Sequence, residues 1–336
     1  MDSPLKVGIN GLGRIGRAAF KVIYDTPELE VVGVNDLINN ENLAYLLKYD
    51  TVYGRYPHDV DYNDDALLVD GKSFPVTHLK DPAELPWEDL EVDVVFECTG
   101  VFTKREDLEK HLKAGAKRVM LSAPTKSEEI LTVVHGSSQN GSDDRIISCA
   151  SCTTNCITPV IEIIGRRVGL KKATLTTLHA YTSSQSIVDG PNKKMRRGRA
   201  AAENFVPTST GAAIATTKAL PQYQGKFDGV AIRAPIPVGS IADIVILTER
   251  PTSAEEVNNI FREEAESDRY RGVLGVTDEP LVSSDIVQDP RASIIDLEMT
   301  QVVDGDLLKV MSWYDNEWGY VNQMVREAAS WANGAG

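Results

Sequence analysis

A glycine-rich turn lies between the first apolar run of the chain and the first helical pattern. The run Leu5–Asn10 predicts a strand, and the glycines of Gly11-x-Gly13-x-x-Gly16 follow it directly. Glycines let a backbone approach a pyrophosphate closely, and the free N–H groups of the helix that follows point toward it. Asp36 follows Gly16 by 20 residues, at the end of a second predicted strand, where a carboxylate accepts both hydroxyls of a ribose. The pattern predicts a dinucleotide-binding βαβ unit, against the simpler alternative of a tight turn with a surface aspartate.

Strands and helices alternate through the first 150 residues. Predicted strands at 30–34, 92–97, 118–121, 130–135 and 145–148 are interleaved with predicted helices at 42–49 and 104–114. Such alternation is typical of a doubly wound parallel sheet. We therefore expect an N-terminal α/β domain of the Rossmann type over residues 1–150, which binds the dinucleotide.

The pattern changes after residue 150. A helix is predicted over 153–168, and long alternating strands follow at 173–181, 229–233, 241–247 and 306–314. These favour an α+β catalytic domain over 151–314, with a largely antiparallel sheet and a few helices on one face. A last helical stretch, 317–331, lies in a C-terminal segment, 315–336, that we expect to pack back on the first domain. A length of 336 residues suits two domains of ordinary size.

The charge balance disfavours nucleic acid as a partner. Acidic residues number 49 and basic residues 35, which gives a net charge of −14 and a surface that repels phosphate backbones. Simple solubility explains this balance, and adaptation to a salty cytoplasm is an alternative. No apolar run reaches the length of about 18 residues that a membrane-spanning helix needs. The start Met1-Asp2-Ser3-Pro4 lacks the positive charge of a secretory leader, so we expect a cytoplasmic protein.

Cys152 is the candidate nucleophile. The spacing of Cys149 and Cys152 fits a zinc or dithiol site, but no second pair of ligands completes a zinc site, so we expect no metal. Cys152 precedes an apolar helix, and Ser151 and Thr153 can cap it. A cysteine at a helix N-terminus is expected to have a lowered pKa and a raised reactivity. The alternative is a small buried side chain, the expectation for Cys149 and Cys156.

His179 is the candidate base. It ends a threonine-rich predicted strand, whereas the other histidines lie in polar or strand-edge contexts. A cysteine with a distant histidine is the minimal equipment for thiol catalysis, although spacing in the sequence does not bring the two together.

Four motifs, in order along nearly the whole chain, resemble one family. They are Lys6-Val7-Gly8-Ile9-Asn10-Gly11-Leu12-Gly13-Arg14-Ile15-Gly16-Arg17, Ala150-Ser151-Cys152-Thr153-Thr154-Asn155, Pro207-Thr208-Ser209-Thr210-Gly211-Ala212-Ala213 and Trp313-Tyr314-Asp315-Asn316-Glu317-Trp318-Gly319-Tyr320. Together they resemble phosphorylating glyceraldehyde-3-phosphate dehydrogenase of the bacterial and eukaryotic type. The resemblance implies reversible oxidative phosphorylation of D-glyceraldehyde 3-phosphate to 1,3-bisphosphoglycerate, with NAD as cofactor, by way of a Cys152 thioester that His179 helps to form and resolve.

The resemblance also implies the binding residues. Two anions, the phosphate of the substrate and inorganic phosphate, would be held by Ser151, Thr153, Thr182, Arg197, Thr210, Gly211 and Arg233. The dinucleotide would contact Gly11, Gly13, Arg14, Ile15, Gly16, Asp36, Lys80, Ser122, Asn316 and Tyr320. The basic loop 193–199 would lie beside the cofactor pocket of a neighbouring subunit in a homotetramer.

Departures from the family pattern leave alternatives open. Gly190-Pro191 stands where Leu-Pro is usual, which leaves NADP open as a second coenzyme, and Asn192 and Val238 also differ.

Two other functions compete with this interpretation. Erythrose-4-phosphate dehydrogenase shares the fold and the cysteine but tends to lack the threonine loop at 207–211. A non-catalytic dinucleotide-binding module would leave the Cys152 and His179 pair without a purpose.

Overall fold

The computed structural model describes residues 3–138 and 144–332, and it divides into two compact units. Unit 1 comprises the described residues of Met1–Val133, Asn140–Ala150 and Met324–Gly336. Unit 2 comprises the described residues of Val134–Gln139 and Ser151–Gln323. Two expectations concern residues that lie outside these ranges. The expectation about a leader involves Met1 and Asp2, and the one about the C-terminal segment involves 333–336.

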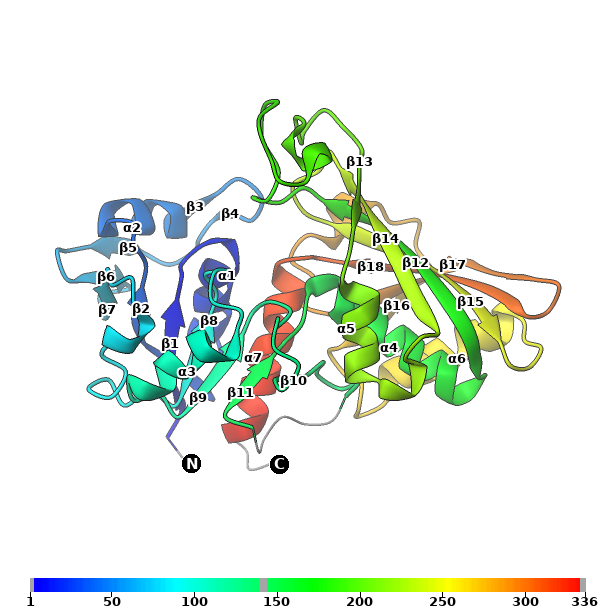
Figure 1. The fold of residues 1–336 in the computed structure, drawn as a ribbon, viewed down its shortest axis with the longest axis horizontal. Coiled ribbons are helices and arrows are strands. Elements are labelled where there is room, and N and C mark those ends of the chain that lie inside the picture. Colours follow the sequence, from blue (N-terminus) through cyan, green and yellow to red (C-terminus); the bar gives the residue numbers. More distant parts are fainter. Residues whose placement is uncertain (1–2, 139–143, 333–336) are drawn as a thin grey trace. The chain divides into compact units, whose positions relative to one another are not determined.

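Unit 1 is built on a nine-stranded sheet with the order β10-β11-β9-β8-β1-β2-β7-β6-β5. The first seven strands in this order are parallel (Figure 1). The strands are β1 (Leu5–Asn10), β2 (Leu29–Asn35), β5 (Val60–Tyr62), β6 (Ala66–Val69), β7 (Lys72–Thr77), β8 (Val94–Glu97), β9 (Arg118–Leu121), β10 (Leu131–Thr132) and β11 (Ile146–Ser148). The helices are α1 (Arg14–Tyr24), α2 (Asn40–Lys48) and α3 (Arg105–Lys113), and β3 (Tyr49–Asp50) pairs with β4 (Gly54–Arg55).

This sheet confirms the predicted doubly wound parallel architecture, and its antiparallel edge was not predicted. Strands β5, β6 and β7 form hairpins within 60–77, a stretch rich in acidic and turn residues. Asp70 and Gly71 both have positive φ, 49° and 77°, in the turn between β6 and β7. An Asp-Gly pair between short apolar runs is a hairpin signal that the sequence offered.

Unit 2 is built on a seven-stranded sheet with the order β13-β14-β12-β15-β18-β17-β16. Its strands are β12 (Leu170–Ala180), β13 (Val206–Ser209), β14 (Phe227–Ala234), β15 (Ser240–Thr248), β16 (Leu274–Thr277), β17 (Ser293–Val303) and β18 (Leu307–Tyr314). Its helices are α4 (Cys152–Arg167), α5 (Ala212–Ala219) and α6 (Ala254–Glu266), with 3-10 turns at Met195–Gly198, Pro221–Tyr223 and Ser283–Ile286. Helix α7 (Trp318–Ala332) begins in unit 2 and ends in unit 1.

The sheet of unit 2 is largely antiparallel, as predicted, and only the β12–β14 and β16–β17 pairs are parallel among its described strands. Residues of β15 alternate between buried and half-buried, because one face of the sheet is covered. Helix α4 contacts α5 and α6 as well as the strands, so the three helices cover that face (Figure 1).

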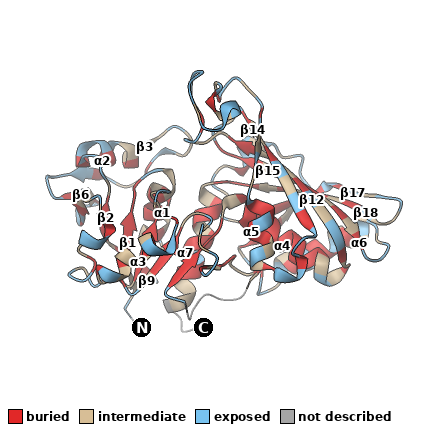
Figure 2. Ribbon diagram, in the orientation of Figure 1, coloured by how far each residue is buried: buried red, intermediate tan, exposed pale blue. Residues whose placement is uncertain are grey.

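Most of α4 is buried between the sheet and its neighbouring helices (Figure 2). Its apolar side chains Ile157, Val160 and Ile164 enter the core of unit 2, with Cys156 among them. Because most of the helix is buried, the position of its first residue, Cys152, is fixed by packing. Among the described residues, no helix is both long and apolar enough to cross a membrane.

Candidate active site

The glycine turn of unit 1 is as tight as its sequence predicts. A Cβ at Gly16 would lie 1.9 Å from the carbonyl oxygen of Gly11, so α1 can begin this close to β1 only with glycine there. Gly11 has φ +90°, and a Cβ on it would lie 2.8 Å from the backbone nitrogen of Thr99. Around Gly13, by contrast, a Cβ would meet nothing within 4 Å. The turn is thus closed toward the protein and open at Gly13.

Gly13 opens into a cavity of about 420 Å³ that lies within unit 1. The cavity is lined by Asn10, Gly11, Gly13, Asn35, Asp36, Leu37, Leu79, Lys80, Cys98, Thr99, Val101 and Phe102. The carboxylate of Asp36 is anchored at its mouth, because it accepts the N–H of Leu12 at 2.7 Å and that of Ile38 at 3.0 Å. An open glycine, the start of a helix and an anchored carboxylate fit a dinucleotide.

The other residues predicted to contact the dinucleotide fall in both units. In unit 1, Lys80 lines the cavity, Ile15 is in the first turn of α1, and Ser122 follows β9. Arg14 pairs with Asp50 at 2.5 Å and lies over the ring of Tyr53.

In unit 2, Asn316 and Tyr320 are buried. The side-chain oxygen of Asn316 accepts the N–H of Gly239 at 3.2 Å and the hydroxyl of Ser240 at 3.0 Å. These two donors fix the orientation of the amide, so its NH₂ group points the other way.

Cys152 is the first residue of α4, and Ser151 caps that helix through its hydroxyl, which accepts the N–H of Thr154 at 3.2 Å. The Cys152 Sγ lies 3.3 Å from the Nε2 of His179, at the end of β12. Both residues belong to unit 2. The structure therefore brings together the two residues that the sequence could not place in contact.

Arg233 completes this pair. It lies opposite His179 in the register of the parallel strands β12 and β14, and its Nη1 is 2.5 Å from the His179 Nδ1 and 2.9 Å from the carbonyl oxygen of Ala180. The Nδ1 of His179 is itself 2.7 Å from that carbonyl oxygen. With its proton on Nδ1 and donated to the Ala180 oxygen, His179 has Nε2 as an acceptor that faces the thiol. The Arg233 Nη1, which only donates, then bonds the Ala180 oxygen and not Nδ1.

Burial dominates the protonation of both groups. It lowers the pKa of His179 to about 3, with Arg233 lowering it further, so the imidazole is neutral near pH 7 and able to accept a proton. Burial raises the pKa of the Cys152 thiol, whereas Arg233 and hydrogen bonds at the start of α4 lower it. The expectation that the helix N-terminus lowers the thiol pKa overall is wrong for this site, because desolvation outweighs it.

A polar cluster in unit 2 connects two of the predicted anion-binding residues. The hydroxyl of Ser184 lies 2.8 Å from that of Thr182 and accepts from Arg197 at 3.4 Å. The Nε of Arg197 also donates to the hydroxyl of Thr208 at 3.0 Å. Ser184 and Thr208 were not predicted, although Ser184 stands two residues after Thr182 and Thr208 lies inside the 207–211 motif.

Apart from Arg233 on β14, the remaining predicted anion-binding residues stand at helix starts. Thr210 accepts the N–H of Ala212 at 3.2 Å, and Gly211 is the N-cap of α5. The hydroxyl of Thr153 turns inward and lies 2.9 Å from that of the buried Tyr314. The Nε of Arg233 is buried and has no hydrogen-bond partner among the described residues.

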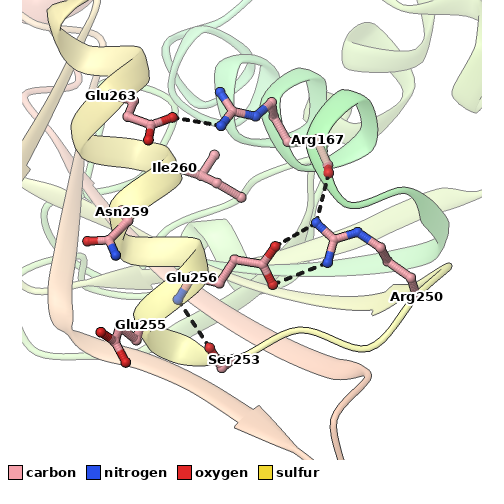
Figure 3. Close-up of a pocket in the computed structure, with 8 residues that line it drawn as sticks. All are labelled: Arg167, Arg250, Ser253, Glu255, Glu256, Asn259, Ile260 and Glu263. Atoms are coloured by element: carbon pink, nitrogen blue, oxygen red, sulfur yellow. Dashed lines mark hydrogen bonds and ion pairs between the residues drawn. The ribbon is translucent and has the colours of Figure 1, made fainter.

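A second cavity in unit 2, of about 440 Å³, contains none of the predicted site residues (Figure 3). Its two arginines are already paired. Arg250 bonds Glu256, and Arg167 bonds Glu263. These guanidiniums are neutralised by their neighbours, so this cavity is an ion-paired surface crevice.

Two stretches of the chain match the two domains of a known family. Residues 5–105 match the NAD binding domain of glyceraldehyde 3-phosphate dehydrogenase, and residues 151–316 match its C-terminal domain. Glyceraldehyde-3-phosphate dehydrogenase of Thermotoga maritima is 49% identical over 324 residues, 95% of this chain and 97% of its own. The enzymes of Streptomyces coelicolor and Haloarcula vallismortis are each 46% identical, over 96% and 97% of both chains, respectively.

Proposed function

The chain belongs to the glyceraldehyde-3-phosphate dehydrogenase family, and from this we propose that it catalyses the reversible oxidative phosphorylation of D-glyceraldehyde 3-phosphate with NAD. The observation that carries the proposal is the 3.3 Å contact between the Cys152 Sγ and the His179 Nε2 at the start of a buried helix. A thiol paired with a neutral imidazole is equipped to form and release a thioester.

Cys152 supplies the nucleophile. Its sulfur forms a bond to the aldehyde carbon, and the thiol proton ends on the aldehyde oxygen, which becomes the hydroxyl of a hemithioacetal. The neutral His179 takes this hydroxyl proton as the carbon is oxidised to a thioester. The N–H of Cys152 at the start of α4 and the protonated His179 stabilise negative charge on that oxygen. An oxygen of inorganic phosphate then attacks the thioester carbon, the S–C bond breaks, and an acyl phosphate leaves with the sulfur restored.

The two anions are held by hydroxyls and guanidiniums. We assign the substrate phosphate to Thr182 and Arg233, and the attacking phosphate to Ser151, Thr153, Arg197, Thr210 and Gly211. The unpartnered Nε of Arg233 and the helix starts at Cys152 and Ala212 support this assignment, since each presents N–H groups to an anion.

NAD, when bound, supplies the acceptor for the hydride. The cavity beside Gly13 and the anchored Asp36 support its adenosine end lying in residues 1–150. Asn316 would orient the nicotinamide amide and Tyr320 would pack beside the ring. Residues 151–314 form the catalytic domain in this proposal, and the C-terminal segment that contains α7 packs back on the first domain.

We propose that the protein works as a homotetramer in the cytoplasm. The exposed apolar side chains of Ile187, Val188 and Met195, in the loop that holds Arg197, support a subunit contact there. A native mass near four times 36.8 kDa tests this assembly, and a monomer in solution would contradict it.

Cys152→Ser tests the mechanism. The serine hydroxyl is scarcely ionised near pH 7, so we expect turnover with glyceraldehyde 3-phosphate, NAD and phosphate to fall by at least about a thousandfold. Circular dichroism should be unchanged, and Cys149→Ser serves as the matched control with near-normal turnover. Ordinary turnover in Cys152→Ser would refute the proposal, and a preference of the wild-type enzyme for erythrose 4-phosphate would move it to that substrate.

A further inference from the structure

A row of four polar side chains, three of them buried, crosses the sheet of unit 1, and two of its members line the cavity beside Gly13. Glu97, Asn10, Asn35 and Thr77 face one another in register on the neighbouring strands β8, β1, β2 and β7. Each is the last residue of its strand, at the carboxyl edge of the sheet. Glu97 is fully buried, and Asn10 and Asn35 are nearly so. Buried polar groups need partners, which makes the hydrogen bonds of this row informative.

The row begins at a histidine whose tautomer is fixed. The indole N–H of Trp87 donates to the Nδ1 of His111 at 3.0 Å, and an indole nitrogen only donates. Nδ1 is therefore an acceptor, the proton of His111 is on Nε2, and Nε2 donates to Glu97 at 3.1 Å. Trp87 and His111 are buried, so this orientation is held by packing as well.

The side chain of Glu97 accepts hydrogen bonds from several donors. Its Oε2 accepts the side-chain amide of Asn10 at 2.6 Å in addition to His111. Its Oε1 accepts the backbone N–H of Thr99 at 2.8 Å and also the Thr99 hydroxyl. A carboxylate is acceptor-only and suits four donors, whereas a carboxamide of the same shape does not.

The direction of these bonds continues across the sheet. Because Asn10 donates to Glu97, its oxygen is free to accept the amide of Asn35 at 2.8 Å. The oxygen of Asn35 accepts the Thr77 hydroxyl at 2.9 Å and the N–H of Leu79 at 3.0 Å, and its NH₂ donates to the Leu79 carbonyl at 3.0 Å. Each amide thus has one allowed orientation, set from the Glu97 end.

Two residues that are hydrogen-bonded to the row, Thr99 and Leu79, line the cavity. Thr99, held twice by Glu97, lines the cavity and lies against Gly11 of the glycine turn. Leu79, held twice by Asn35, lines it together with the next residue, Lys80. We propose that Glu97, oriented by His111, is a positioning residue of the dinucleotide site, which holds Thr99 and Leu79 in place before the ligand arrives. This inference rests on the proposed function, because it takes the cavity to be the dinucleotide site.

Glu97→Gln tests the proposal, since it keeps the size of the side chain and places an NH₂ group where donors already converge. We expect the Kd for NADH, followed by its fluorescence, to rise about tenfold or more. Hydrogen exchange in the ligand-free protein should quicken in peptides that contain Thr99 and Leu79. The rate of Cys152 alkylation should be unchanged. Glu106→Gln, an exposed acid on α3, is the matched control.

His111 supplies a second, graded test if Glu97→Gln does not fold. His111→Gln retains a donor toward Glu97, and His111→Leu does not, so the leucine variant should bind NADH several-fold more weakly than the glutamine variant. Equal binding by the two variants, or an equal loss in NADH binding and in Cys152 alkylation, would overturn the positioning role.

The outcomes separate this role from the proposed function. A wild-type chain that binds no NADH would refute the dinucleotide site itself. A wild-type chain that binds NADH, with Glu97→Gln binding it equally well, would refute only the positioning role.

Discussion

At the scale of the residue, burial determines the protonation state of His179. Its imidazole is nearly inaccessible to solvent and lies beside the Arg233 guanidinium, and both features disfavour a second proton. Because the pKa is lowered to about 3, the ring stays neutral as the pH falls through the usual histidine range of about 6–7. The Nε2 lone pair is therefore unprotonated throughout that range, and the same low pKa makes the ring a weaker base than a free imidazole.

His179→Asn should therefore slow turnover by about 10²–10⁴-fold, the usual effect of losing one general base. Alkylation of Cys152 by iodoacetamide at pH 7 should slow as well. Burial already raises the pKa of the thiol, and in this variant the thiol also loses the imidazole that accepts its proton. In the wild-type enzyme the alkylation rate should rise with pH and show no histidine inflection between pH 5 and 8. Unchanged alkylation in His179→Asn would mean that the imidazole does not activate the sulfur.

We predict that a second residue, Asp36, determines the choice of coenzyme. Both of its carboxylate oxygens accept backbone N–H groups, from Leu12 and Ile38, so the charge cannot rotate away from a 2′-phosphate without losing these bonds. At an effective dielectric of about 20, such a close contact costs on the order of a few kcal/mol. We expect Asp36→Ala to shift the ratio of kcat/KM values toward NADP by at least tenfold, about 1.4 kcal/mol.

Asp89→Ala, at an exposed aspartate of the same unit, is the control and should leave the ratio unchanged. NADP used as well as NAD by the wild-type enzyme would contradict the assignment. Gly190, which has room for a side chain, is then the residue to examine, and Gly190→Leu should reduce any use of NADP.

At the scale of the element, the contact of β1 with α1 depends on one absent methyl group. A Cβ at Gly16 would overlap the carbonyl oxygen of Gly11, which is backbone and cannot move aside. Gly16→Ala should lower the stability of unit 1 by about 3 kcal/mol or more and abolish NADH binding, as seen in the melting temperature and by titration.

Gly13→Ala is its matched partner, because a Cβ there meets nothing within 4 Å. It should leave the melting temperature nearly unchanged and weaken only the binding of the dinucleotide. Equal stability of the two variants would show that the turn is looser than this packing indicates.

At the scale of the whole molecule, the net charge of −14 sets the response to salt. Salt screens the repulsion among like charges, and it also weakens ion pairs such as Lys6 with Glu91. Exposed pairs contribute little, so the repulsion should dominate. We expect the melting temperature to rise by about 2–5 °C between 0.1 and 1 M KCl. A melting temperature indifferent to KCl would remove the interpretation of the acidic surface as an adaptation to salt.

Local patterns in the sequence were sufficient for the features that depend on near neighbours. The glycine turn, the start of α1 and the position of Cys152 at the head of α4 each follow from residues within one or two turns of one another. The alternation of strands and helices likewise predicted the parallel sheet of unit 1 and the largely antiparallel sheet of unit 2. These elements were predictable because periodicity and capping act over short stretches of chain.

Features that depend on distant partners were missed. Helix α5 and strands β13, β16 and β17 carry weak local patterns and are stabilised by packing within unit 2. Helix α6 was missed although its sequence carries a local signal, with Ser253 as N-cap and Glu256 three residues later. Arg233 meets His179 because two parallel strands align them in register, across 54 residues of sequence. Glu97, His111 and Trp87 converge from separate elements in the same way. The raised pKa of Cys152 belongs to this group too, since desolvation is set by everything that surrounds the sulfur and outweighs the helix on which it stands.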